Sequence, residues 1–531
     1  MSPQIGRYTA SQPARTVDGW TLQRLTPPSR LFGANGLRTG PDGRIYVAQV
    51  SGSQITAIDV ATGAIEAISP KGGDIVAPDD LVFDPAGNLY ATEITEGRVS
   101  MRAPNGTTRV IAGDMPVANP ITFHDGRLIA GECRVGGRTM QLDLNGGAPR
   151  VLLDNVPMPN AFDVGPDGKL YIPVMGSNEI WRVSLDGGAH EVVARNLGVP
   201  DSVKFDAEGQ IVSTQVHSGQ VLRIDPRTGD KTVLANLTPG LDNVTFVGRR
   251  TFVSNISGYI AEILEGGQTR DLVSDGFNWP LGLAVDTDGS IYVADGPFSY
   301  TLRSGQPRQQ VGFLFTPGYP GYSRGVAAAG PGEFIVTTAN GDVARYWPAK
   351  RENQVLASGF DQLYGVAVAP KGAVIFVEQG AGRVHSVQSG NVETLATDLK
   401  QPSGVTVSAD GTCFVTESAG GRVVKLSGGR TVTVFNDLRQ PQGILARGDS
   451  LYVVDAGLKE LIEYNLSNGR RRTLAFDLPV GAPRGVTPKV LKAVGTLSGP
   501  MGPFAGIAAG AGGTLYISAD AEGSVLALKP A

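Results

Sequence analysis

The chain has 531 residues, of which 41% are hydrophobic and 18% are charged, and its formal net charge is −4. This composition excludes a disordered chain, and the length exceeds what a single hydrophobic core usually supports, so at least two domains are expected. The small negative charge argues against nucleic acid or an anionic membrane as a partner, and no run of about 18 apolar residues predicts a membrane span.

The N-terminal twenty residues contain no apolar stretch of signal-peptide length, and residues 1–17 are predicted to be a flexible segment. The two cysteines, Cys133 and Cys413, lie in different halves of the chain, which argues against a structural disulfide. Both features suit a reducing compartment, so we expect a cytoplasmic protein. Nothing in the sequence indicates an oligomeric state.

From residue 35 onward one pattern repeats: a short opening, an apolar strand, a turn such as Pro-Asp-Gly, and a second strand like IYVA. Two further strands separate each copy from the next. The clearest copies cover residues 35–49, 160–174, 201–215, 281–295 and 403–417, and weaker copies open at Asp79, Asn119, Asp242, Arg324, Tyr364, Gln442 and Ala505. Eleven intervals separate the twelve units, and all but the last are 39 to 44 residues long.

A period near 40 residues with four short strands is typical of propeller blades, and Gly or Pro interrupts every run before a helix could form. Because propellers have about 4–8 blades, the twelve units divide into six and six. The sequence thus predicts an all-β chain with two tandem six-bladed β-propellers, over residues 18–279 and 280–531. The last unit has room for only three strands, and residues 20–26 are predicted to complete it.

Two segments interrupt the pattern, residues 296–322 and residues 479–503. Both are rich in Gly and Pro. We expect them to be loops that fill an interface between the domains; the alternative is a lid over a propeller mouth.

The residue that opens each unit is the strongest functional signal. It enters the first strand of its blade, so six such residues surround one mouth of the central channel. In the first half all six are Asn or Asp, and in the second half none is; the first set is Asn35, Asp79, Asn119, Asn160, Asp201 and Asp242, and the second is Leu281, Arg324, Tyr364, Ser403, Gln442 and Ala505.

A ring of carboxylate and amide oxygens suits a hard divalent cation, Ca²⁺ or Mg²⁺. Zinc is disfavoured because no two of the four histidines have ligand spacing. The candidate metal ligands are the six opening residues of the first half, Asn35, Asp79, Asn119, Asn160, Asp201 and Asp242. The alternative is a water-filled polar channel without a metal.

A second set of polar residues ends the second strands near the same mouth: Gln49, Glu93, Glu132, Gln215 and Asn255, with Val174 as the exception. We expect Glu93, Glu132 and Gln215 to contact a substrate. His217 follows the second strand of unit five and faces the same mouth as Asp201, so it is a candidate catalytic residue. A packing or surface role is the alternative for this lone histidine.

The second half is expected to hold no metal and to stabilise or shape the first propeller. A rival interpretation is a second ligand site lined by Arg324 and Tyr364, with Glu378 and Glu417 below them.

The first half, over roughly residues 30–280, resembles the senescence-marker-protein/gluconolactonase (regucalcin-like) family of six-bladed propellers. The match is best at 159-PNAFDVGPDGKLYIP and 200-PDSVKFDAEGQIVST, which look like that family's consecutive Asn and Asp ligand blades. The resemblance implies metal-dependent lactone hydrolysis, with Asn160 and Asp201 as ligands, Asn119 as a substrate or metal contact, and the aspartate able to act as base. The family usually has a glutamate where this chain has Asn35, and Asp79, Asp242 or Glu132 could compensate. The second half resembles generic NHL-type repeats.

We therefore expect a metal-dependent hydrolase of a lactone or related cyclic ester, acting on a small-molecule substrate, with Asp201 as the base. One alternative is an isomerase or lyase that uses the same channel site. The other is a non-catalytic propeller that binds a partner or serves as a scaffold.

Overall fold

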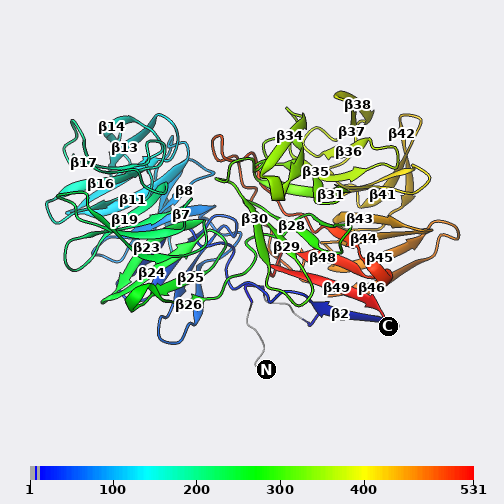
Figure 1. Ribbon diagram of the computed structural model, residues 1–531, viewed down its shortest axis with the longest axis horizontal. Coiled ribbons are helices and arrows are strands. Elements are labelled where there is room, and N and C mark those ends of the chain that lie inside the picture. The colour runs from blue at the N-terminus through cyan, green and yellow to red at the C-terminus, as the bar shows by residue number, and fades with distance from the viewer. Residues whose placement is uncertain (1–5, 9–11) are drawn as a thin grey trace. The chain divides into compact units, whose positions relative to one another are not determined.

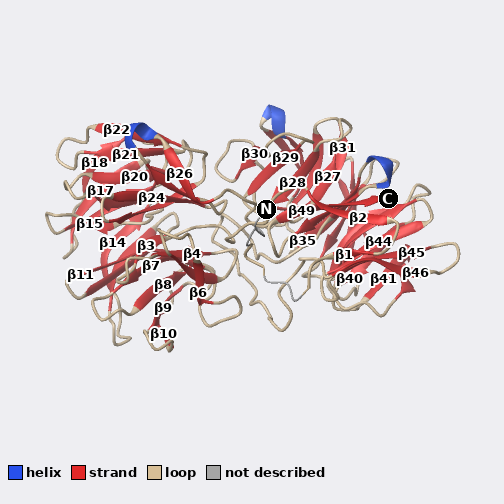
Figure 2. Cartoon of the chain, turned by 90° about the horizontal axis from the view of Figure 1, so that it is seen from below, coloured by secondary structure: helices blue, strands red, loops and turns tan. Residues whose placement is uncertain are grey.

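The computed structural model describes residues 6–8 and 12–531, and almost all of its regular structure is β-strand (Figure 1). In this part of the chain the strands form twelve antiparallel sheets, each built mainly from four consecutive strands. Figure 2 shows the only helical pieces among these residues, the short 3₁₀ turns Glu265–Gly267, Pro348–Lys350 and Ala511–Gly513. The prediction of an all-β chain with two six-bladed propellers is confirmed. No helix in the described residues has the length and apolar character that crossing a membrane requires.

The chain separates into two compact units. The first propeller consists of Arg30–Asp275 together with Val486–Gly495, and the second consists of the residues up to Ser29, Gly276–Gly485 and Thr496–Ala531. This division differs from the expected domains 18–279 and 280–531 in three places, since residues 18–29 and 276–279 belong to the second propeller and residues 486–495 to the first.

The six blades of the first propeller follow the chain in order. Their strands are β3 (Leu37–Thr39), β4 (Ile45–Gln49), β5 (Gln54–Ile58), β6 (Ile65–Ser69); β7 (Pro78–Phe83), β8 (Leu89–Glu93), β9 (Arg98–Arg102), β10 (Thr108–Ala112); β11 (Ala118–His124), β12 (Arg127–Glu132), β13 (Gly137–Leu142), β14 (Arg150–Val156); β15 (Asp163–Val164), β16 (Lys169–Val174), β17 (Glu179–Ser184), β18 (Glu191–Arg195); β19 (Pro200–Phe205), β20 (Ile211–Gln215), β21 (Gln220–Ile224), β22 (Lys231–Asn236); β23 (Leu241–Val247), β24 (Arg250–Asn255), β25 (Ile260–Ile263) and β26 (Thr269–Val273).

The second propeller repeats the arrangement, with N-terminal strands added to its last two blades. Its strands are β27 (Leu283–Val285), β28 (Ile291–Asp295), β29 (Phe298–Leu302), β30 (Gln309–Phe313); β31 (Ser323–Gly330), β32 (Glu333–Thr338), β33 (Val343–Trp347), β34 (Glu352–Ala357); β35 (Leu363–Val368), β36 (Val374–Glu378), β37 (Arg383–Gln388), β38 (Asn391–Ala396); β39 (Pro402–Val407), β40 (Cys413–Glu417), β41 (Arg422–Ser427), β42 (Arg430–Phe435); β43 (Pro441–Arg447), β44 (Ser450–Asp455), β45 (Glu460–Asn465), β46 (Arg471–Phe476), β1 (Arg15–Thr16); and β47 (Ile507–Ala509), β48 (Leu515–Ala519), β49 (Ser524–Pro530), β2 (Trp20–Arg24).

The N-terminal residues are part of the second propeller. Strand β2 pairs antiparallel with β49, which brings the blue and red ends of the chain together in Figure 1. Strand β1 pairs with β46. Arg7 donates hydrogen bonds to four backbone carbonyls of this propeller, including that of Asn278 at 2.6 Å. The expectation of a flexible segment over residues 1–17 is thus wrong for these described residues, and residues 1–5 and 9–11 lie outside the described part.

Residues 296–322 do not form the expected loop, because they contain the third and fourth strands of a blade, β29 and β30. Their aromatic side chains pack within that blade, and the rings of Phe298 and Phe313 stack with centroids 4.7 Å apart. The many aromatic residues therefore reflect the core of this blade.

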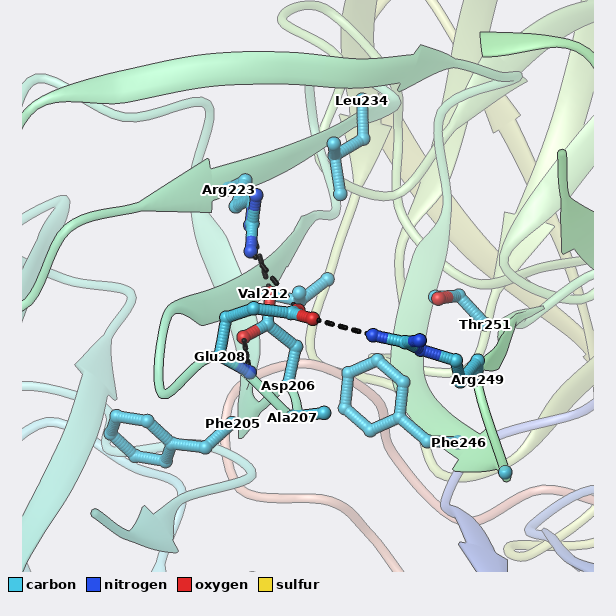
Figure 3. A pocket seen from close by; sticks show the side chains of 11 residues that line it. Phe205, Asp206, Ala207, Glu208, Val212, Arg223, Leu234, Phe246, Arg249 and Thr251 are labelled. Atoms are coloured by element: carbon cyan, nitrogen blue, oxygen red, sulfur yellow. Dashed lines mark hydrogen bonds and ion pairs between the residues drawn. The ribbon is translucent and has the colours of Figure 1, made fainter. Parts of the chain in front are cut away.

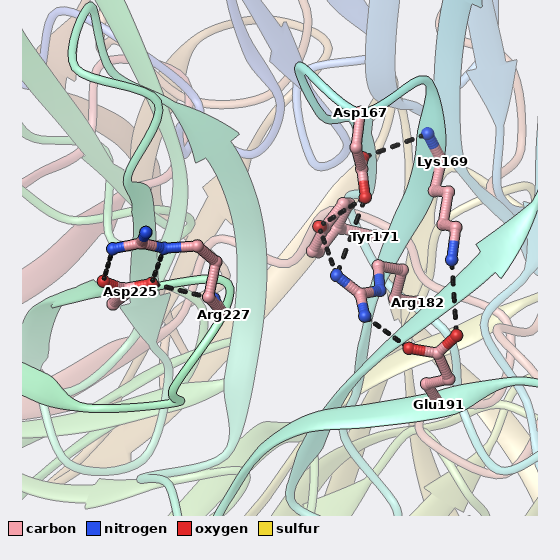
Figure 4. Close-up of polar contacts among 7 residues, drawn as sticks. All are labelled: Asp167, Lys169, Tyr171, Arg182, Glu191, Asp225 and Arg227. Carbon is pink, nitrogen blue, oxygen red and sulfur yellow. Dashed lines mark hydrogen bonds and ion pairs between the residues drawn. The ribbon is translucent and has the colours of Figure 1, made fainter.

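The hydrophobic core lies between successive blades. One cluster joins blades one and two through buried side chains that include Tyr46, Leu81 and Leu89. Polar networks on the outside tie strands of one blade together; in blade four, Arg182 bonds Tyr171 and Glu191 (Figure 4). Exposed pairs of this kind add little stability, so burial between the blades contributes most.

Hydrogen bonds between neighbouring blades fix the start of several first strands. A hydroxyl near the end of a second strand donates to the carbonyl of the residue that opens the next blade, as Thr92 does to Asn119 at 2.8 Å. Ser254 in blade six donates to the carbonyl of Asn35 in blade one at 2.7 Å, which closes the first ring. Ser518 makes the same bond to Leu281 in the second propeller. The opening residues are therefore held at the positions where blades meet.

Candidate active site in the first propeller

The six opening residues of the first propeller are all buried: Asn35, Asp79, Asn119, Asn160, Asp201 and Asp242. Asp79, Asn119, Asp201 and Asp242 are each the second residue of the first strand of their blade, and Asn35 and Asn160 lie two and three residues before theirs. We call these six residues the polar ring.

Three carboxylates of the polar ring interact unfavourably with one another. Burial, followed by the charges of the other aspartates, raises the pKa of Asp79 and of Asp201 well above the ordinary value. Burial and the charge of Asp80 raise the pKa of Asp242 to about 8. Burial and the same ring charges raise the pKa of the Cys133 thiol, which places this free cysteine near the ring. A concentration of buried negative charge of this kind favours a bound proton or a bound cation.

The hydrogen bonds of the ring are incomplete. Asn35 Nδ2 donates to Asp242 Oδ2 at 3.2 Å, and Asn35 Oδ1 accepts from the amide of Val50. Asn160 Oδ1 accepts from the amide of Ala161, which leaves one lone pair on that oxygen. Asp201 Oδ1 is buried and has no hydrogen-bond partner in the structure. A buried carboxylate oxygen without a hydrogen-bond partner is costly, so Asp201 Oδ1 is a candidate contact atom for a ligand.

A second layer of charges lies further along the first strands. Arg38, three residues after Asn35, donates to the carbonyls of Leu81 and Ile121, each at 3.1 Å. Lys204, three residues after Asp201, is buried and donates to the carbonyl of Phe162 at 3.2 Å. Burial and the Arg38 charge lower the pKa of Lys204 to about 8.

Asp80 interacts electrostatically both with Arg38 and Lys204 and with the aspartates of the polar ring. Arg38 and Lys204 act on it electrostatically, and Asp80 in turn acts on Asp79, Asp201 and Asp242. Sequence reasoning missed Arg38 and Lys204, although a basic residue at the third place after the opening residue was visible in both units.

The residues that end the second strands are bonded to groups of the protein. Glu93 accepts from the amide of Val76 at 2.8 Å, and Gln215 accepts from the amide of Gly198 at 2.9 Å. Glu132 is fully buried and forms ion pairs with Arg134 and Arg138. Their polar atoms are therefore engaged within their own blades.

The bond from an earlier backbone amide to the side chain that ends a second strand also occurs in the second propeller, which lacks the polar ring. There too, an acidic side chain at the end of a second strand accepts from a backbone amide 16 or 17 residues earlier; the acceptors are Asp295, Glu378, Glu417 and Asp455. We call this bond the blade latch. Because it occurs in both propellers, it accounts for Gln49, Glu93 and Gln215 without a substrate.

His217 is exposed, and its backbone amide donates to the carbonyl of Gly198 at 3.2 Å. The structure brings it to the turn after β20 but records no bond between its ring and Asp201. The other histidines have local contacts: His190 stacks on Trp181 with centroids 3.7 Å apart, and His385 bonds Glu378 at 2.9 Å.

Within the described residues, no three His, Cys, Asp or Glu side chains are placed so that they could share a metal ion. A cation in the polar ring would therefore need amide oxygens among its ligands. The chemistry of the ring fits this requirement, because it offers hard oxygen donors only, uncompensated carboxylates and the unpartnered Asp201 Oδ1.

A large open groove lies elsewhere. It has a volume of about 750 Å³ and is lined by the turns after β19 and β23, at the opposite end of these strands from Asp201. Figure 3 shows that its charged residues pair with one another: Asp206 with Arg223, and Glu208 with Arg223 and Arg249. None of the expected site residues lines this groove.

Comparison with known proteins supports the resemblance of the first half. Residues 3–252 match the model of the SMP-30/Gluconolactonase/LRE-like region, and residues 277–301 match an NHL repeat. No curated protein matches the chain.

Solved structures match at low identity. A streptogramin B lyase structure is 18% identical and covers 52% of this chain and 94% of its own. Virginiamycin B lyase from Staphylococcus aureus is 15% identical, with 52% and 96% covered, and a nidogen/laminin complex is 20% identical, with 43% and 92% covered. The TM-score is 0.39 in each case, too low to support an argument about function.

Proposed function

We propose that the polar ring of the first propeller binds one divalent cation, Ca²⁺ or Mg²⁺, and that this site hydrolyses a lactone or a related cyclic ester. The observation that carries the proposal is Asp201 Oδ1, a buried carboxylate oxygen without a partner, in a ring where burial and then the neighbouring charges raise the pKa of Asp201. The family match over residues 3–252 supports the choice of reaction class.

Asn160 and Asp201 are the proposed metal ligands, together with Asp79, Asp242, Asn35 or Asn119. A bound divalent cation supplies positive charge that polarises a carbonyl group and stabilises an oxyanion. It also offsets the repulsion among the three aspartates, which protein atoms of the ring do not neutralise.

Asp201 is the proposed general base. A carboxylate can take a proton from a water molecule that lies within hydrogen-bond reach. Asp201 Oδ1 takes a proton from water while the water oxygen bonds to the carbonyl carbon. The ring C–O bond then breaks, and the proton passes to the leaving oxygen, which yields an open-chain hydroxy acid.

The remaining expected residues are assigned according to their contacts. Asn119 is buried in the ring and can donate to a substrate oxygen. Exposed His217 is proposed to contact substrate at the rim and not to replace Asp201 as the base.

The test is a panel of lactones and esters assayed by pH-stat, with chelator or with Ca²⁺ or Mg²⁺. We expect metal-dependent ring opening, and Asp201→Asn, which removes the base and keeps the shape, should lower kcat at least about a hundredfold. Asp225→Asn is the matched control, since Asp225 lies in the same blade but pairs with Arg227 in an exposed turn (Figure 4). Equal rates for wild type and Asp201→Asn would refute the mechanism. Isomerisation or elimination products without ring opening would favour the alternative reaction at the same site.

A further inference from the structure

In the second propeller, Arg324 lies at the place in its blade that each residue of the polar ring occupies in a blade of the first propeller. It opens the second blade, and its side chain is fully buried. Its Nη1 donates to the carbonyl of Leu363 at 3.1 Å, and the guanidinium lies over the ring of Tyr364, 4.6 Å from the centroid. These contacts hold the guanidinium in place.

The other edge of the guanidinium is unsatisfied. Nε and Nη2 of Arg324 are buried and have no hydrogen-bond partner, and no carboxylate forms an ion pair with Arg324 in the described part of the chain. A guanidinium remains charged in proteins, and a buried charge without a counter-charge is strongly unfavourable. The structure therefore requires an acceptor here that protein atoms do not supply.

Neighbouring polar groups cannot fill this role. Glu378 accepts from the amide of Asp361 and bonds His385, and Glu417 accepts from the amide of Lys400 and pairs with Arg422. The two glutamates that were expected below Arg324 thus form blade latches with these backbone amides. Gln442, which opens the fifth blade of the second propeller, accepts from the amide of Ala505 at 2.7 Å.

A loop covers the pair of Arg324 and Tyr364. The ring of Phe504 lies 6.0 Å from that of Tyr364, and Met501 and Phe504 are buried. A Cβ atom on Gly502 would come within 2.3 Å of the Tyr364 hydroxyl oxygen, so the backbone itself closes over the tyrosine. This cover limits the size of any ligand.

A small cavity lies among the first strands of the second propeller, next in sequence to Arg324 and Tyr364. It has a volume of about 50 Å³, and its lining includes Gly325, which follows Arg324, and Phe504. The first strands contribute a glycine from every blade to the lining, namely Gly282, Gly325, Gly365, Gly404, Gly443 and Gly506. Since one water needs roughly 10–15 Å³, the cavity has room for only a few non-hydrogen atoms.

We propose that Arg324 binds a small carboxylate, of the size of formate or acetate, in the mouth of the second propeller. The Nε and Nη2 hydrogens point in parallel from one edge of the guanidinium, and this fork matches the two oxygens of a carboxylate. The short apolar remainder of the ligand then extends toward the cavity that Gly325 and Phe504 help to line. The second propeller is then a ligand-binding domain in its own right, independent of catalysis in the first.

The experiment measures the melting temperature of the full chain while sodium formate or sodium acetate replaces sodium chloride at constant ionic strength. We expect a saturable rise, since a ligand that binds only the native state stabilises it. Arg324→Met should abolish the concentration dependence. Arg303→Met, which removes a half-exposed arginine paired with Asp288 in the neighbouring blade, should retain it.

Three results would overturn the proposal: an unchanged melting temperature of the wild type, a rise retained by Arg324→Met, or an equal rise with the bulkier phosphate ion. If Arg324→Met does not fold, a crystal structure grown in acetate decides the question. Carboxylate density on Nε and Nη2 of Arg324 supports the site, and water alone at these atoms refutes it.

Discussion

Asn35 Nδ2 donates to Asp242 Oδ2 at 3.2 Å, so the first and last blades of the first propeller meet through a side-chain bond inside the polar ring. An asparagine here gives one buried aspartate a donor, whereas a carboxylate would add a further negative charge. The identity of residue 35 therefore sets how much negative charge the ring carries.

Replacement of Asn35 by Asp should weaken the metal-free protein and strengthen its response to Ca²⁺. The change removes the bond to Asp242 and adds a charge to the ring, and we expect a loss of about 1–3 kcal/mol in chelator, with a larger gain in melting temperature on adding Ca²⁺. Asn88→Asp is the matched control, because Asn88 also donates to an aspartate, Asp84, but lies in a partly exposed turn. Equal Ca²⁺ responses in both variants would argue against a cation in the ring.

The metal-free protein should lose stability as the pH rises from about 5 to 8. Because the pKa of Asp242 is raised to about 8 in the folded state, the native protein retains a proton that the unfolded chain releases above its ordinary pKa of 3.8. The native state thus binds more protons in this window, and stability falls with increasing pH. Urea unfolding in chelator at several pH values measures the slope. Asp242→Asn should make the slope less steep, with Asp79 and Asp201 supplying the remainder. Stability that increases with pH in this window would contradict the assignment.

Glu132→Gln should lower stability by about 1–3 kcal/mol without changing KM. Glu132 is buried between Arg134 and Arg138, so the loss of its charge leaves two partners unpaired. Glu417→Gln removes the equivalent charge in the second propeller and serves as the matched variant. Denaturation and steady-state kinetics measure both. A raised KM for Glu132→Gln but not for Glu417→Gln would support the expected contact between Glu132 and a substrate.

Arg7→Met should destabilise the second propeller by about 2–4 kcal/mol. The side chain donates to the carbonyls of Phe277, Asn278, Asp520 and Ala521, which lose their donors together. Arg15→Met is the control, because Arg15 is 66% exposed and its pairing with Asp477 is long, at 3.7 Å. Equal melting temperatures for the two variants would show that the N-terminal segment adds no stability.

The sequence alone determined the blade number, the period and the polar ring, because each blade repeats a local pattern of turns and apolar strands. The Pro-Asp-Gly turn is one example, since Gly43 adopts a φ of 77°, which favours glycine. The sequence also showed that the six opening residues are all Asn or Asp in the first half and that none of the six is in the second half.

Tertiary structure decided which polar residues are free to act. Glu93, Glu132 and Asp201 were all polar residues near one mouth in the sequence, yet the first two have bonded partners and Asp201 Oδ1 has none. Likewise, only the packing of the blades and of the covering loop leaves one edge of Arg324 without an acceptor. Hydrogen-bond satisfaction depends on the three-dimensional surroundings of each atom, and a repeat pattern does not encode it residue by residue.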